Sequence, residues 1–244
     1  MSDTPVLEPA AAYALWADAY PPNAHNPLMQ AEERAMLSLL PADLSGARVL
    51  DAGCGSGRYL VQARRRGAQQ LLGVDLSAEM LARAIGIGDR GSGIGEAAPD
   101  LRPLTPDPWL VQASLDAIPI RGGWADITIC GLTLGHLEDL RAALAELRRV
   151  TQPGGSVVCS DIHPIGQALG WRREFSVDER RYAVRHIWHS IGDWRDAAGA
   201  LGLEVVRMLE PRLDPADIPA GARFDPAALE APVALVFELR RTYR

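Results

Sequence analysis

A glycine-dense turn between two apolar runs is the feature that most constrains how this chain folds. In the stretch VLDAGCGSGRYLVQARRRGAQQLLGVDLSAEML, residues 49–81, an apolar run ends at Asp51, and the chain then turns through three glycines into a helical pattern. The glycines are Gly53, Gly55 and Gly57. A second apolar run ends at Asp75. Because glycine has no Cβ, backbone can approach a ligand closely there. The stretch predicts a strand–turn–helix–strand unit with a ligand at its strand ends.

Strand-like and helix-like patterns alternate along most of the chain. The short apolar runs are Ala47–Asp51, Leu71–Asp75, Trp109–Ala113, Ala125–Cys130 and Ser156–Ser160. This alternation predicts a mostly parallel sheet with helices on both faces. Two later strand candidates, 202–209 and 231–241, have no helical pattern between them and are expected to pair antiparallel. Two helices are expected within residues 1–40.

Composition excludes several classes of protein. The net charge of −6 disfavours a nucleic-acid surface, and the 48% hydrophobic content can fill a sizeable core. No apolar run approaches the roughly 20 residues that span a bilayer, and the first residues lack a signal-peptide pattern, so a cytoplasmic enzyme without membrane association is expected. The three cysteines have no CxxC spacing, and neither a metal site nor a disulfide framework is expected. The oligomeric state is not indicated.

Asp75, at the end of the second apolar run, indicates which class of ligand binds. Asp75 ends its strand at a distance from the glycines where a carboxylate can accept hydrogen bonds from ribose hydroxyls, which indicates an adenosine-containing cofactor. Nicotinamide dinucleotides favour GxGxxG, whereas the order here is GxGxG. Asp51 would repel a pyrophosphate but could hold a cationic amino group. A nicotinamide-dependent oxidoreductase and a non-catalytic adenosine-cofactor binding protein remain as alternatives.

The pair VLDAGCGSGRY and GVDLSAEML resembles the first two motifs of the class I S-adenosylmethionine-dependent methyltransferases. QASLDAIPI, WADITICGLTLGHLEDL and LRRVTQPGGSVVCSD are similar to later parts of that family, so the resemblance covers residues 47–161. It implies a Rossmann-like α/β fold with a seven-stranded, mostly parallel sheet and an antiparallel strand near the C-terminus. A single domain is expected, with N-terminal helices (1–40), a cofactor-binding core (47–161), an acceptor-side insertion (162–192) and a C-terminal helix with strands (193–244).

The resemblance also implies which residues bind the donor, S-adenosylmethionine, which becomes S-adenosylhomocysteine. Around the methionine part it implies Asp51, Gly53 and Gly55, and for the ribose it implies Asp75. Leu76 and Met80 would pack near the adenine, and Cys130 and Gly131 would close the other side. Ser114 stands where many members have an aspartate for the adenine amino group, and Leu115 would add an apolar contact.

The acceptor site is expected outside these motifs, on the N-terminal helices around Tyr13, Trp16 and Tyr20 and on the insertion 162–192. That insertion gathers histidines and aromatic residues, which suits a small-molecule acceptor. For a hydroxyl acceptor, His163 is the first candidate for a general base and His189 the second. His136 is expected to have a structural or capping role. The Gly- and Pro-rich segment 86–108 is expected to be a surface insertion outside the cofactor site.

Overall fold

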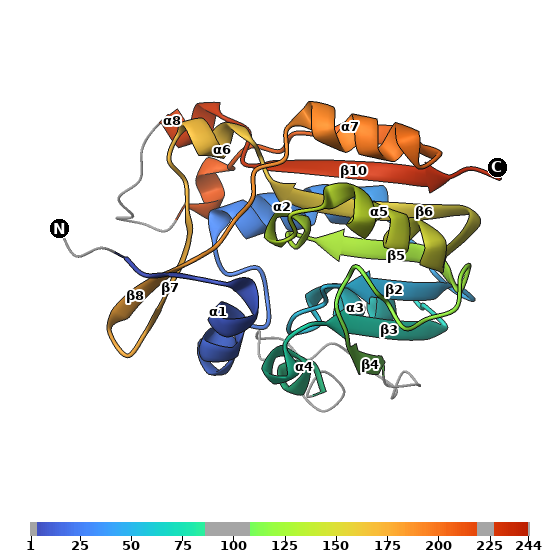
Figure 1. Ribbon diagram of the computed structural model, residues 1–244, viewed down its shortest axis with the longest axis horizontal. Coiled ribbons are helices and arrows are strands. Elements are labelled where there is room, and N and C mark those ends of the chain that lie inside the picture. Colours follow the sequence, from blue (N-terminus) through green and yellow to red (C-terminus); the bar gives the residue numbers. More distant parts are fainter. Residues whose placement is uncertain (1–3, 86–107, 219–226, 244) are drawn as a thin grey trace.

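The computed structural model of the chain describes residues 4–85, 108–218 and 227–243. Its main sheet has seven strands in the order β4-β3-β2-β5-β6-β10-β9 (Figure 1). Their bounds are β2 Arg48–Ala52, β3 Gln70–Asp75, β4 Trp109–Gln112, β5 Ala125–Gly131, β6 Thr151–Ile162, β9 Leu203–Leu209 and β10 Ala234–Arg241. The pairs from β4 to β6 are parallel, whereas β10 runs antiparallel to both β6 and β9. The expected seven-stranded sheet, with its antiparallel strand near the C-terminus, is confirmed.

Capping residues explain where the longer helices begin. In α2 (Pro27–Leu39), Asn26 accepts a hydrogen bond from the Met29 amide, and Pro27 occupies the first turn. In α5 (Leu140–Val150), Asp139 caps the Ala142 amide, and the basic residues Arg148 and Arg149 lie in the last turn, at the negative end of the helix dipole. The other main helices are α1 Pro9–Trp16, α3 Arg58–Arg65, α4 Ala78–Ile85 and α7 Ile191–Ala200.

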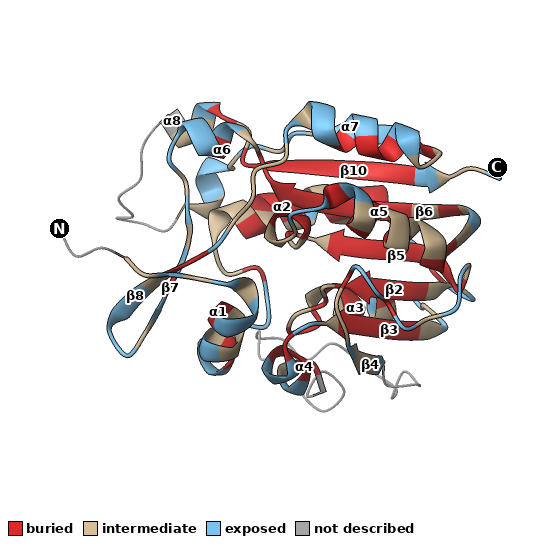
Figure 2. Ribbon diagram, in the orientation of Figure 1, coloured by how far each residue is buried: buried red, intermediate tan, exposed pale blue. Residues whose placement is uncertain are grey.

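The apolar strands of the sheet are buried between two helical layers (Figure 2). One core cluster joins the sheet to α5 and α7, with Leu144, Leu147 and Trp194 among its buried members. A second cluster joins the opposite face to α2 and α3 through residues such as Met36 and Leu60. Burying both faces holds the strand ends in fixed positions, so the loops that follow β2, β3 and β5 meet at one edge of the sheet.

A second, three-stranded sheet lies beyond that edge, in the order β1-β8-β7 (Figure 1). It pairs β1 (Val6–Leu7) in parallel with β8 (Arg180–Val184), and β8 forms a hairpin with β7 (Arg173–Val177). The insertion after β6 therefore contains strands as well as the short helix α6 (Ile165–Ala168). The N-terminal residues and this insertion form one layer, in which α1 contacts β7 and β8 on one side and α4 on the other.

Some boundaries differ from the sequence-based expectation. Strand β6 extends over Thr151–Ile162, well beyond the apolar run predicted at 156–160, because its residues pair with both β5 and β10. The segment 86–108 lies, except for its last residue, outside the described residues. The remaining short elements are η1 Ala17–Ala19, η2 Leu134–His136, η3 Pro215–Asp217 and α8 Ala227–Glu230. Within the described ranges, no helix has the length and apolarity needed to cross a membrane.

Candidate active site

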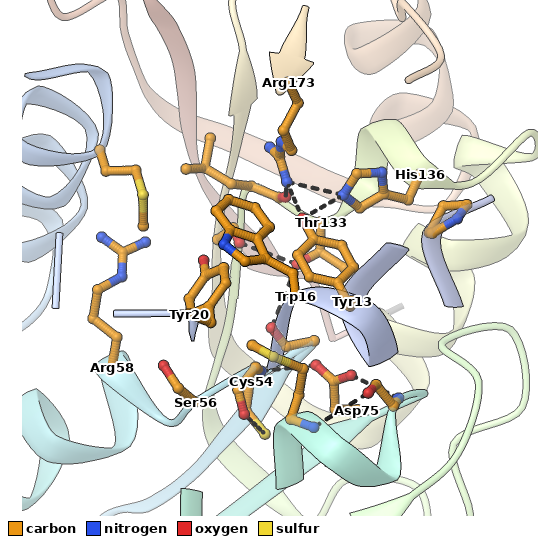
Figure 3. A pocket seen from close by; sticks show the side chains of 18 of the residues that line it. Tyr13, Trp16, Tyr20, Cys54, Ser56, Arg58, Asp75, Thr133, His136 and Arg173 are labelled. Atoms are coloured by element: carbon orange, nitrogen blue, oxygen red, sulfur yellow. Dashed lines mark hydrogen bonds between the residues drawn. The ribbon is translucent and has the colours of Figure 1, made fainter. Parts of the chain in front are cut away.

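A cavity of about 450 Å³ opens at the carboxyl ends of β2, β3 and β5. One wall comes from the loops after these strands, and the other comes from α1, η2 and the start of β7. Figure 3 shows Asp75 at one end of the cavity and Arg173 with His136 at the other, with Tyr13 and Trp16 between them. We call the end with Asp75 the donor half and the end with Arg173 the acceptor half.

The glycine turn forms the floor of the donor half. Gly53, Gly55 and Gly57 all have left-handed backbone conformations, with φ of 73°, 52° and 84°. A Cβ on Gly53 would lie 2.5 Å from the Thr133 side chain, so glycine is required there for space as well as for conformation. Thr133 in turn donates a hydrogen bond of 3.0 Å to the Gly131 carbonyl. The turn after β2 is therefore packed directly against the end of β5.

Asp75 holds this turn and faces the cavity. Its Oδ2 accepts a hydrogen bond of 2.7 Å from the Gly55 amide, and its Oδ1 accepts one of 2.9 Å from the Ser77 amide. A carboxylate oxygen has two lone pairs, so each oxygen can still accept a hydroxyl. Burial raises the pKa of Asp75, although the three backbone amides around it offset part of that effect. Ribose hydroxyls are the ligands that this geometry suits.

Apolar side chains flank Asp75. Leu76 is half exposed toward the cavity, Met80 is buried beneath Gly55, and Leu115 follows β4. Ser114 and Gly131 also line the cavity. Of the ten residues expected at the donor, the structure brings eight to the cavity wall, namely Gly53, Gly55, Asp75, Leu76, Met80, Ser114, Leu115 and Gly131.

The other two, Asp51 and Cys130, lie behind the wall. Cys130 is fully buried in β5, and burial raises the pKa of its thiol well above the usual range. Asp51 is buried beneath the glycine turn, and neither of its carboxylate oxygens makes a hydrogen bond with a described residue. Burial raises the pKa of Asp51 to about 7, although Arg58 and the Leu60 amide favour its charged form. A buried carboxyl group without a partner is a feature to be explained by a ligand.

Three polar side chains meet in the acceptor half. Arg173 Nη1 donates to the Tyr13 hydroxyl over 2.6 Å and lies 2.9 Å from His136 Nε2. The Tyr13 hydroxyl lies 3.0 Å from the same His136 nitrogen. An arginine cannot accept a hydrogen bond, so Nε2 must be the acceptor, and the imidazole proton sits on Nδ1, 3.2 Å from the Arg185 carbonyl. Burial and the charge of Arg173 lower the pKa of His136 well below its usual value, so this imidazole is neutral.

A second arginine lies between the two halves. Arg58, the first residue of α3, lines the cavity and pairs with Glu32 at 3.0 Å and Glu33 at 3.5 Å. Glu32 is fully buried and also accepts hydrogen bonds from Tyr59 and Ser160. Arg58 therefore carries its own counter-ions, and its network joins α2 to α3 and β6.

The histidines of the insertion are less central than the sequence predicts. His163 is buried at the end of β6, where its Nε2 lies 3.0 Å from Glu210. His189 Nε2 bonds the Leu137 carbonyl over 3.0 Å. Neither is among the residues that line the cavity, whereas His136, expected to be structural, is. The catalytic roles of His163 and His189 stay predictions from the sequence.

Sequence reasoning missed Arg58, Thr133 and Arg173 as site residues. Arg58 carries a signal, because it directly follows the last glycine of the turn. Thr133 and Arg173 carry none that spacing reveals. Arg173 reaches the cavity only because β7 is held by β8, and β8 by β1.

The fold and the donor half define an α/β protein that binds an adenosine-type cofactor at the switch point of a doubly wound sheet. Residues 50–159 match the family model described as "Methyltransferase domain". Over 196 residues the chain is 34% identical to the malonyl-[acyl-carrier protein] O-methyltransferase of Salmonella typhimurium, covering 76% of this chain and 68% of the relative. The chain therefore belongs to the class I S-adenosylmethionine-dependent methyltransferases.

A second relative and one solved structure are also similar to this chain. The malonyl-[acyl-carrier protein] O-methyltransferase of Enterobacter lignolyticus is 32% identical over 183 residues, covering 73% of this chain and 62% of that protein. The chain spans about three fifths of the length of several such relatives. A crystal structure of an S-adenosylmethionine-dependent methyltransferase from Mesorhizobium loti aligns with a TM-score of 0.65 and 26% identity, covering 86% of this chain and 98% of that one.

Proposed function

We propose that this protein transfers a methyl group from S-adenosylmethionine to a small molecule bound in the acceptor half. The observation that carries the proposal is the continuity of the cavity, which joins the glycine turn and Asp75 to Tyr13, His136 and Arg173. A cofactor site without a second, chemically distinct half would suit a binding protein. Here the second half is enclosed by aromatic side chains and holds polar groups that the donor motifs do not use.

The residues of the donor half fit this cofactor. Asp75 offers two acceptor oxygens for the ribose hydroxyls, and Leu76, Met80 and Leu115 offer an apolar slot for the adenine. The unpartnered carboxyl group of Asp51 lies under the turn, where an ammonium group of the methionine part would supply the missing partner, directly or through water. The bound donor supplies an electrophilic methyl group on a sulfonium, which carries its own leaving group.

The protein then has three tasks, which are to position the two reactants, exclude water and hold the acceptor in line. Tyr13, Trp16 and Tyr20 cover the cavity from α1 and η1. Trp16 stacks on Phe175 of β7, with ring centroids 4.7 Å apart and an interplanar angle of 11°. This contact joins the two parts of the cover. The acidic charge of the chain supports a metabolite rather than a nucleic acid as the acceptor.

Calorimetry tests the donor half directly. The parent protein is expected to bind S-adenosylmethionine and S-adenosylhomocysteine but not NADH. Asp75→Ala should weaken the binding of both sulfur cofactors by roughly 1.5–3 kcal/mol, because it removes a charged acceptor that also positions Gly55. Glu79→Ala, an exposed carboxylate on the neighbouring helix, serves as the control and should bind normally. Binding of NADH in place of the sulfur cofactors would overturn the proposal.

A mass-spectrometric search tests the transfer itself. Purified protein and a donor with a deuterated methyl group are added to a cell extract, and metabolites that gain the label are identified. Labelled product that requires the parent protein and is lost with Asp75→Ala supports the enzyme. Normal donor binding with no labelled metabolite in any extract would favour a non-catalytic binding protein.

A further inference from the structure

Arg173 is a charged group in the acceptor half that lacks a carboxylate partner among the described residues. The contrast with Arg58 is informative, since Arg58 lines the same cavity but pairs with two glutamates. Every hydrogen-bond partner of Arg173 among the described residues is formally neutral. They are the Tyr13 hydroxyl at 2.6 Å, the Leu132 carbonyl at 2.9 Å and His136 Nε2 at 2.9 Å. Arg173 is partly buried, and a partly desolvated guanidinium favours an anion as its partner.

The hydrogen bonds of Arg173 leave one edge of the guanidinium available. All three go through Nη1, and in the described part of the chain neither Nη2 nor Nε has a hydrogen-bond partner. Asp161 attracts Arg173 at longer range, but its carboxylate already accepts from the Gly135 and Ile162 amides. A planar edge with two parallel N–H donors matches a carboxylate, which it can bind through two hydrogen bonds.

The position of Arg173 is fixed from the donor side. Its backbone partner, Leu132, has a left-handed conformation with φ of 55°, which is uncommon for leucine. The Leu132 amide is held in turn by the Ser160 hydroxyl at 3.1 Å. Leu132 directly precedes Thr133, which contacts Gly53 of the glycine turn. The free edge of Arg173 is therefore anchored beside the strand end that forms the donor half.

We propose that the acceptor is a carboxylic acid, that Arg173 binds its carboxylate through the free edge, and that the product is a methyl ester. This inference rests on the proposed methyltransferase function and names its substrate class. One carboxylate oxygen forms a bond to the donor methyl carbon while the carbon–sulfur bond breaks, and the electron pair of that bond stays on sulfur as S-adenosylhomocysteine. A carboxylate and a sulfonium become two uncharged centres, and no proton is transferred.

The rest of the acceptor half agrees with this chemistry. A carboxylate is ionised at neutral pH, so it needs no general base, and a neutral His136 that accepts from Arg173 acts as a positioning residue. Tyr13, Trp16 and Tyr20 line the same cavity and give it aromatic surface between Arg173 and the donor half. We therefore expect acids with an apolar body rather than compact polyanions.

Paired ligands test the inference on the complex of the protein with S-adenosylhomocysteine. Benzoate, phenylacetate and hexanoate are each compared with their amides, which have nearly the same shape but no charge. Calorimetry on the parent complex should show at least one acid that binds about 10-fold or more tightly than its amide. Arg173→Met should abolish this preference, and Arg173→Lys, which keeps the charge but loses the fork, should reduce it. Arg180→Gln removes a charge from the same hairpin outside the cavity lining and should keep it.

Each outcome separates the inference from the function on which it rests. If the parent fails to bind S-adenosylhomocysteine, the proposed function fails. If it binds that cofactor but no acid binds better than its amide, or if the preference survives in Arg173→Met, the carboxylate inference alone is overturned. The parent comparison stands even if Arg173→Met does not fold.

Two further measurements complete the test. The first concerns the alternative that Arg173 binds the carboxylate of the donor. Methylthioadenosine lacks that carboxylate. If Arg173→Met weakens S-adenosylhomocysteine but not methylthioadenosine, Arg173 belongs to the donor and the inference is wrong. For any acid that binds, the deuterated donor should give a product that releases labelled methanol in mild base, as a methyl ester does. A base-stable methylated product would also overturn it.

Discussion

At the scale of single residues, Asp51 links the glycine turn to the charge of the cofactor. Its folded-state pKa of about 7 lies above the usual value of 3.8, because burial disfavours the charged carboxylate. The folded protein therefore keeps a proton that the unfolded chain has lost between about pH 4 and pH 7. In the absence of ligand, this group makes the free energy of unfolding fall as the pH rises through that window.

A cationic ligand should favour the charged form of Asp51 and so lower its pKa. If the donor ammonium pairs with the charged form, S-adenosylhomocysteine should bind about 10-fold more tightly at pH 8 than at pH 6. Calorimetry at both values measures this change, and Asp51→Asn should remove it. Methylthioadenosine, which has no ammonium group, should bind equally at both values. The same pH dependence with methylthioadenosine would assign the titration to Asp75, whose pKa is also raised by burial.

The two histidine assignments can be separated by one pair of variants. The sequence favours His163, but that side chain contacts Glu210 outside the cavity lining, whereas His136 contacts both Arg173 and Tyr13. We expect His136→Phe to lower the labelled product in the extract assay by about 10-fold or more, because Arg173 and Tyr13 lose the nitrogen that positions them. The affinity for S-adenosylhomocysteine should be nearly unchanged. His163→Gln should stay within a few-fold of the parent. The reverse result would restore His163 as the general base.

Individual residues also show how far a sequence can be read. Asp75, Gly53 and Gly55 were predictable because a strand, a tight turn and a second strand bring them together within one local unit. Arg173 was not, since it is far from that unit in sequence. Its contacts with Tyr13 and His136 depend on the packing of three separate segments.

At the scale of elements, the turn between β2 and α3 is the most constrained part of the site. Gly53 and Gly46 both have positive φ, of 73° and 81°, but a Cβ would meet Thr133 only at Gly53, and nothing lies within 4 Å at Gly46. Alanine at either position should cost about 1–2 kcal/mol of stability from backbone strain. Only Gly53→Ala should also weaken S-adenosylhomocysteine, by about 10-fold or more, because the turn must move away from Thr133.

Thermal unfolding and calorimetry on both alanine variants test this difference, and Gly46→Ala is the matched control. Equal losses of cofactor affinity would show that strain anywhere near β2 is sufficient. No loss in Gly53→Ala would show that the turn can adjust without affecting the donor half.

The hairpin β7–β8 was not predicted from the sequence, which indicated only an acceptor-side insertion rich in histidines and aromatic residues. Its two-residue turn, Asp178–Glu179, has positive φ at both positions, of 49° and 62°. Such turns usually carry Asn-Gly or Asp-Gly, and without glycine the sequence gives no hairpin signal. The strands are held instead by pairing with β1 and by the stacking of Phe175 on Trp16. The main sheet was predictable because each of its strands contains a short apolar run.

At the scale of the whole molecule, two structural layers enclose one cavity. The donor half is built on the seven-stranded sheet, and much of the acceptor half is built on α1 and the small sheet. Side-chain contacts such as that of Arg173 with the Leu132 carbonyl join the cover to the core. A ligand that touches both walls should therefore stabilise the molecule as one unit, whereas a ligand confined to the core should protect the core alone.

This difference gives a prediction for the bound state. At 100 times its dissociation constant, S-adenosylhomocysteine should add about 2.7 kcal/mol to the free energy of unfolding and raise the melting temperature. Hydrogen exchange should slow after β2 and β3, and also in residues 9–20, because Tyr13, Trp16 and Tyr20 line the same cavity as Asp75. NADH at the same concentration should change neither measurement. Protection limited to the sheet, with residues 9–20 exchanging as in the free protein, would mean that the cover closes on the acceptor alone.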